Sequence, residues 1–177
     1  MPQDLLLMEE VDVRRADDPT GDTSKVLTIT KMALVTPERK EAEHTPGGGV
    51  GTVNFLLPML NALEPKFSVK GIDRDAIRGF GFVPGAFDKW TFAATLRNTR
   101  TNEVIPVRST LRGLISTWAP GEHTPGELID CDHTLKEVTY ADLVVDGEEL
   151  FAWGFYERIA RSGGIDWFAR YRNALGA

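Results

Sequence analysis

The stretch Leu143–Phe151, which reads Leu-Val-Val-Asp-Gly-Glu-Glu-Leu-Phe, decides the fold class of this chain. Its central dipeptide Asp146-Gly147 favours a two-residue turn, because both residue types tolerate a positive φ. The turn joins two runs of strand-forming residues, so the stretch predicts a β-hairpin. Farther on, Ser162-Gly163-Gly164 interrupts the chain, and Asp166 is placed to cap a short helix that starts at Trp167. A hairpin followed by a glycine-hinged aromatic helix suits docking against a neighbouring surface.

Alternating apolar and polar residues predict further strands upstream of this hairpin. These runs cover 25–35, 63–70, 90–97, 104–115 and 128–145, and the third and fourth form a second hairpin. We expect 63–70 at a sheet edge, because Pro65 has no N–H to donate to a neighbouring strand. The apolar side of the last run changes after Glu137, which indicates a bulge or a bend between packed sheets. Asp73 is placed to cap a helix over 74–80.

The fold class is therefore mainly β (α+β), an antiparallel barrel or sandwich with extended hairpins, a short central helix and a C-terminal helix. At 177 residues the chain predicts one domain over 1–177. Residues 12–23 are polar and turn-rich. Residues 37–51 are polar and end in glycines, which predicts a long flexible arm or disorder. Such an arm contributes little to a core, so we expect a chain that lacks 38–49 to fold but not to stack.

Composition limits the classes of function. The net charge of −6 disfavours a protein that grips nucleic-acid phosphates, whereas it suits a surface past which nucleic acid slides. The single cysteine, Cys131, excludes an internal disulfide framework and suits a reducing cytoplasm. The N-terminal residues lack the pattern of a signal peptide, and no apolar run has the length of a membrane span, so we expect no membrane insertion.

Sites for chemistry are few. Cys131 and His133 share one face of a predicted strand with Asp132 on the other, which leaves too few ligands for a metal and favours packing. The same pair lacks an orienting third group for nucleophilic catalysis. The glycine-rich run 47–51 is followed by extended residues and not by a phosphate-binding helix. We therefore expect no enzyme activity, no catalytic or metal site and no cofactor.

Taken in order along the chain, several short motifs resemble the major tail tube proteins of contractile phage tails, the family that includes R-type pyocin tubes. The motifs that carry this resemblance are Leu27–Met32, Gly48-Gly49, Phe67–Gly71, Arg74–Gly81, Ser109–Ile115, Pro120-Gly121, Gly126-Glu127, Val138–Tyr140, Leu143–Gly147, Gly164–Asp166 and Arg172–Gly176. Residues 4–24 depart from the family's usual opening, and Tyr140 is followed by alanine where the family has a second tyrosine.

The resemblance implies hexameric rings that stack into a hollow tube inside a contractile sheath, and a tube that conducts DNA. Implied partners are identical copies, the sheath protein, a tape-measure protein or DNA in the lumen, and baseplate and tail-terminator proteins. The implied location is the virion tail tube, assembled in the host cytoplasm. Candidate subunit-contact residues are Arg39, Gly47, Gly48, Gly49, Arg112, Asp146, Gly147, Asp166 and Trp167, and candidate lumen-facing residues are Asp130 and Asp132.

Three alternatives remain open at this point. The same subunit architecture serves the inner tube of a headless tailocin or of a secretion-like injection device. A monomeric β-barrel that binds a small ligand in an apolar interior is a second alternative. An enzyme that depends on Cys131 and His133 is the third.

Overall fold

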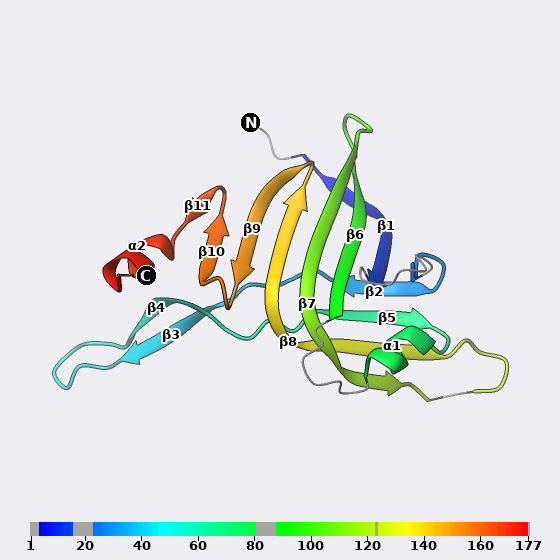
Figure 1. The fold of residues 1–177 in the computed structure, drawn as a ribbon, viewed down its shortest axis with the longest axis horizontal. Helices are drawn as coiled ribbons and strands as arrows, with labels where there is room; N and C mark the ends of the chain where they lie inside the picture. The colour runs from blue at the N-terminus through cyan, green and yellow to red at the C-terminus, as the bar shows by residue number, and fades with distance from the viewer. Residues whose placement is uncertain (1–3, 16–22, 81–87, 123, 177) are drawn as a thin grey trace.

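The computed structural model describes residues 4–15, 23–80, 88–122 and 124–176 (Figure 1). The strands are β1 (Leu6–Arg15), β2 (Ile29–Ala33), β3 (Arg39–His44), β4 (Val53–Leu60), β5 (Lys66–Lys70), β6 (Asp88–Asn98), β7 (Val104–Pro120), β8 (Asp130–Val145), β9 (Glu148–Gly154), β10 (Ile159–Ser162) and β11 (Ile165–Asp166). The helices are α1 (Arg74–Gly79) and α2 (Ala169–Ala174). All strand pairs are antiparallel, which confirms the predicted fold class. Neither described helix is long and apolar enough to cross a membrane.

Nine strands form one bent sheet in the order β1-β6-β7-β8-β9-β10-β11, with β5 and then β2 added beside the first part of β8. We call β1, β6, the first part of β7, the last part of β8, β9 and β10 the main layer. The cross layer consists of β2, β5, the first part of β8 and the last part of β7. Figure 1 shows the strands of the cross layer running across the lower end of the main layer, so the strands of the two layers cross instead of lying aligned.

The bend between the layers lies where the sequence predicts a change of face. Glu137 has a φ of 50°, and the β7–β8 register shifts between Arg112 and Leu114. Gly113 lies opposite this bulge, and a Cβ atom there would be 3.0 Å from the carbonyl oxygen of Lys136. Before the bulge Leu135 is buried, and after it Val138 is buried. The extra residues therefore turn β8 from one layer into the other, which confirms the predicted bend.

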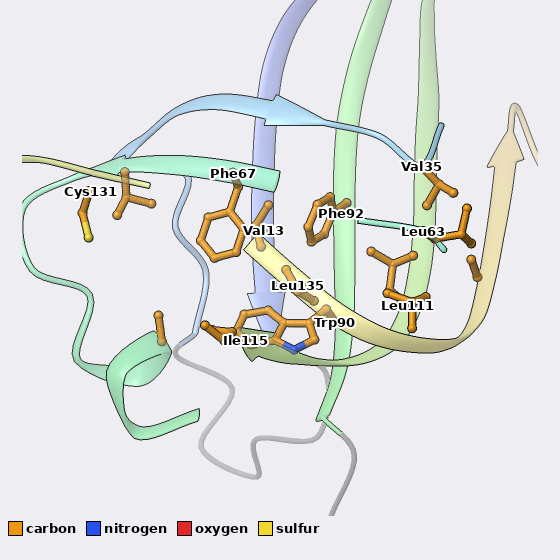
Figure 2. Packing of buried hydrophobic residues seen from close by; sticks show 14 of the residues in the cluster. Val13, Val35, Leu63, Phe67, Trp90, Phe92, Leu111, Ile115, Cys131 and Leu135 are labelled. Carbon is orange, nitrogen blue, oxygen red and sulfur yellow. The ribbon is translucent and has the colours of Figure 1, made fainter. Parts of the chain in front are cut away.

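The core fills the angle between the two layers. Phe92 and Trp90 come from the main layer, whereas Phe67 and Leu135 come from the cross layer, and all four are almost completely buried (Figure 2). The Phe67 ring meets the Phe92 ring edge to face at 5.9 Å between centroids, a favourable geometry for aromatic pairs. Large side chains thus occupy the interior that a ligand-binding barrel would leave open.

The segment expected to be a polar arm belongs to a separate two-stranded sheet, β3–β4, which projects from the side of the body (Figure 1). It is longer than 37–51, because Val53–Leu60 returns as the second strand. The tip lies at Gly47–Gly49, where the N–H of Gly49 donates to the oxygen of Pro46 at 3.1 Å. Every residue from Arg39 to Leu56 is exposed. We call β3, β4 and their turn the arm hairpin.

Several expectations about boundaries are wrong. Strand β5 lies between β2 and β8 and not at an edge, because Pro65 precedes the strand and only its carbonyl oxygen bonds, to the N–H of Leu135 at 2.9 Å. The expected strand 25–35 starts only at Ile29. Part of the polar stretch 12–23 belongs to β1, whereas 16–22 lies outside the described residues.

The C-terminal helix is also shorter than predicted. Its N-cap is Phe168, and the carboxylate of Asp166 instead accepts a hydrogen bond from the N–H of Phe168 at 2.9 Å. Asp166 belongs to β11, which follows the short strand β10, so the chain before the helix is part of the sheet. By contrast, Asp73 caps α1 as predicted, accepting from the N–H groups of Asp75 and Ala76. The Asp146-Gly147 turn is confirmed as well, with φ values of 51° and 80°.

Candidate assembly surfaces

The first candidate surface is the outer edge of β1. This strand pairs only with β6 within the described residues. The end of its outer edge is covered, since Asp12 accepts from the N–H of Lys25 at 2.8 Å and Arg15 accepts from Thr23 at 2.9 Å. The start of β1 carries the exposed apolar run Leu5–Met8. An edge strand with exposed apolar side chains is a site for pairing with another chain.

The second candidate surface is the opposite edge of the main layer. There β10 pairs with β9 on one side. On the other side β11 pairs with Arg161 and Ser162 and the N–H of Trp167 donates to the oxygen of Ala160 at 3.1 Å, so the two-residue β11 is the outermost strand. The side chains of Ile165 and Phe155 near this edge are largely exposed. The β1 edge and the β10–β11 edge lie on opposite sides of one layer. The β1 edge of one copy can therefore contact the β10–β11 edge of the next copy, and each copy keeps its other edge for a further neighbour.

The third candidate surface is the arm hairpin. On one of its faces, Ala42 pairs with Phe55 and His44 pairs with Val53. Phe55 is 56% exposed and Val53 is 53% exposed, so this face presents apolar side chains to solvent. A two-stranded hairpin is marginally stable in isolation. A partner that covers the apolar face of the arm hairpin would therefore stabilise it.

At the base of the arm hairpin, the structure brings together three of the candidate contact residues. The Arg39 guanidinium lies 5.5 Å from the centroid of the Trp167 ring, close enough for a cation–π interaction. The carboxylate of Asp166 accepts from Arg172 at 2.7 Å and belongs to the same C-terminal segment. Burial of the Asp166 carboxyl raises its pKa, but hydrogen bonds from Arg172 and from the N–H groups of Phe168 and Ala160 outweigh burial and lower the pKa below its usual value.

The other candidate contact residues lie apart from this junction. Gly47, Gly48 and Gly49 occupy the far end of the arm hairpin. Arg112 lies on the solvent face of the main layer, 5.9 Å from the centroid of the Tyr140 ring. Asp146 and Gly147 form the β8–β9 turn at the opposite end of the main layer. Their contacts with other subunits remain predictions.

Asp130 and Asp132, the candidate lumen residues, lie on the cross layer. Asp130 pairs with the ammonium group of Lys70 at 2.7 Å, and Asp132 accepts from the hydroxyl of Ser68 at 2.5 Å. Both carboxylates are therefore partnered by β5, the neighbouring strand. Their position relative to a channel remains a prediction.

Cys131 and His133 lie in the core, as the packing interpretation expects. Each side chain is 1% exposed, and the His133 ring stacks on Phe67 with 4.8 Å between centroids. Burial lowers the pKa of His133 and raises the pKa of Cys131. Among the described residues, no three His, Cys, Asp or Glu side chains are grouped so as to hold a metal ion.

Sequence reasoning missed two parts of these surfaces. The apolar run Leu5–Met8 does not match a targeting signal, but its position beside an alternating segment is also typical of an edge strand. The apolar face of the arm hairpin was missed because Val53 and Phe55 follow the glycine-rich run and had no assigned partner strand.

Open sheet edges and a projecting hairpin are features of a β-rich subunit that builds larger assemblies. The comparison with protein families identifies the family: the sequence profile described as "Phage tail tube protein FII" matches residues 21–176, so this chain belongs to that family. The chain is a structural subunit of a tail tube. No curated protein sequence matches it.

Solved structures support the same fold. A chain of "an Extracellular Contractile Injection System, PVC sheath/tube terminator in extended state" has a TM-score of 0.51 at 10% identity, covering 82% of this chain and 99% of that one. A chain of the PVC sheath-tube complex has a TM-score of 0.48 at 11% identity, covering 76% and 86%. Hcp1 from Salmonella typhimurium has a TM-score of 0.44 at 9% identity, covering 86% and 99%. At these identities the first match shows a shared fold.

Proposed function

We propose that this chain forms hexameric rings, and that the rings stack into the hollow inner tube of a contractile phage tail that conducts DNA during injection. The observation that carries the proposal is that the sheet ends on opposite sides in the first half of β1 and in β11, each unpaired on its outer side among the described residues. Contacts between opposite edges repeat by one rotation, and they close into a ring where that rotation is a whole fraction of a full turn. Ring closure would pair the edges that a monomer leaves exposed.

The arm hairpin is our candidate for the contact between rings. It projects beyond the body, and its apolar face around Phe55 is uncovered. The tip glycines Gly47 and Gly48 have room for close approach, since a Cβ atom at either would meet nothing within 4 Å. Docking of this hairpin on the next ring would bury the apolar face and fix the stacking distance.

The proposed partners follow from the family. They are identical copies, a sheath protein around the tube, a tape-measure protein or DNA in the lumen, and baseplate and tail-terminator proteins. One similar solved chain comes from a sheath-tube complex, which agrees with a sheath as partner. The proposed location is the virion tail, after assembly in the host cytoplasm. A tailocin or a secretion-like device would use the same subunit, and particles without DNA would indicate one of these.

We further propose that the subunit has no catalytic role. The enzyme alternative depends on Cys131 and His133, and both are packed inside the core where a substrate does not reach them. The ligand-binding alternative depends on an open interior, which aromatic side chains fill. An apolar cleft of about 510 Å³ lies instead between the arm hairpin and the body.

Electron microscopy of the purified protein and two sets of variants tests the assembly. We expect tubes from the natural chain. Replacement of residues 42–55 by Asn-Gly shortens the arm hairpin without removing a buried residue, so rings should form and fail to stack. The double variant Leu5→Lys/Leu7→Lys adds charge to the β1 edge and should leave folded monomers.

The matched control for the edge variant is Ile72→Lys/Leu128→Lys, which adds the same charge at exposed residues away from both edges. This control should still form tubes. If the natural chain stays monomeric at high concentration, the proposed function is wrong. If the edge variant forms rings as readily as the control, ring closure does not use β1.

A further inference from the structure

Trp167 lies where the sheet edge, the core and the arm hairpin meet. Its backbone N–H donates to the carbonyl oxygen of Ala160 in β10 at 3.1 Å. Its indole Nε1–H donates to the carbonyl oxygen of Pro58 in β4 at 3.4 Å. Its ring packs near Phe151 of β9, with 6.5 Å between centroids, and Arg39 of β3 lies over it. One residue thus contacts both strands of the arm hairpin and the edge strand of the main layer.

Among the described residues, the base of the arm hairpin also contacts the body through Leu60 of β4, which packs against the core. The pair between Glu38 and Asn61 closes the base, at 2.8 Å from N to O, but it joins the arm only to itself. Next to Trp167, an apolar cleft separates β4 from the β9–β10 turn, and Pro58, Ala160 and Phe168 line it. Met59 and Tyr156 line this cleft and are largely exposed. The arm hairpin is therefore attached to the body at its base, through Trp167 and Leu60, beside an open cleft.

We propose that Trp167, assisted by Arg39, is the positioning residue that fixes the direction of the arm hairpin relative to the β10 edge. The consequence of this inference is that the stacking geometry of the rings depends on the C-terminal segment. That consequence rests on the proposed function. The backbone of Trp167 bonds the edge strand, and its side chain bonds the arm. A neighbour that joins at β10–β11 therefore steadies the same residue that holds the arm, so ring closure favours stacking.

The direction of the arm hairpin is measurable on the dispersed subunit by the distance between two spin labels. Gly48→Cys places one label at the tip, where a side chain meets nothing within 4 Å, and Glu103→Cys places the other on the exposed β6–β7 turn. The natural Cys131 is 1% exposed and does not compete for the label in the folded chain. The chain with natural Arg39 and Trp167 should give one narrow distribution of distances between the two labels.

Trp167→Phe keeps the aromatic ring and removes the indole N–H, and Arg39→Gln removes the cation while leaving Trp167 in place. Each should raise the population of displaced arms about fivefold, the factor that corresponds to about 1 kcal/mol of hydrogen-bond or cation–π energy. Trp118→Phe is the matched control, because Trp118 is a partly exposed tryptophan of the cross layer. It should leave the distribution narrow.

A broadened distribution in both junction variants, with poor stacking of otherwise normal rings, supports the proposal. An unchanged distribution in Arg39→Gln and in folded Trp167→Phe overturns it. Circular dichroism shows whether Trp167→Phe is folded, and if it is not, Arg39→Gln alone decides the outcome. Since the label distance is measured on single subunits, a natural chain that forms no rings would refute the proposed function without affecting this test.

Discussion

His133 makes the stability of this subunit depend on pH. Its side chain is 1% exposed, and neither ring nitrogen has a hydrogen-bond partner among the described residues. Burial is the largest cause that lowers its pKa, and the Lys25 ammonium acts in the same direction. Asp73 and Asp132 act in the opposite direction but do not outweigh burial. The folded subunit therefore holds His133 neutral at a pH where the unfolded chain already binds a proton.

The sign of the effect follows from proton binding. The pKa of His133 is lower in the folded state than the ordinary value of 6.5, so between those two values the unfolded chain binds more protons. Stability then rises with pH, and it falls as the pH drops below about 6.5. One proton contributes at most about 1.4 kcal/mol per pH unit to this loss. The loss ends below the pKa of the folded state, where both states are protonated.

His133→Phe removes this proton while keeping an aromatic ring that stacks on Phe67. We expect the free energy of unfolding of the natural chain, minus that of the variant, to fall as the pH drops below about 6.5, with a slope of at most about 1.4 kcal/mol per pH unit. Urea titrations of the dispersed subunit at several pH values, followed by tryptophan fluorescence, measure it. His44→Gln, at an exposed residue of the arm hairpin, is the control and should follow the natural chain. Parallel pH curves for the natural chain and His133→Phe would show that the reasoning is wrong.

Two further substitutions test the local backbone. Gly113→Ala places a Cβ 3.0 Å from the Lys136 oxygen and 3.2 Å from Val138, so we expect a loss of about 1–3 kcal/mol in urea unfolding, whereas Gly48→Ala at the open arm tip should cost little. Gly147→Ala forces a side chain into a φ of 80° and should lower the free energy of unfolding by about 1–2 kcal/mol; a neutral result would mean that the turn adopts another conformation.

The candidate site was only partly predictable. Arg39 and Trp167 were each singled out as contact residues, but their contact with each other was not foreseen, because 127 intervening residues carry no signal that brings them together. The same limit applies to the N-terminal run Leu5–Met8. Its exposure matters only because β1 is an edge strand, and the edge is defined by where β6 lies.

The sequence alone determined those features of the fold that depend on residues close together in the chain. The Asp146-Gly147 hairpin, the Asp73 cap and the change of face after Glu137 depend on neighbouring residues, and the structure has all three. The order of short motifs was enough to indicate the family. The tertiary structure alone decided that β5 is an inner strand, that the arm is a hairpin reaching Leu60, and that Trp167 joins this hairpin to the sheet. Strand order and pairing arise from contacts between segments far apart in the chain, and a strand's own residues do not specify which neighbour it meets.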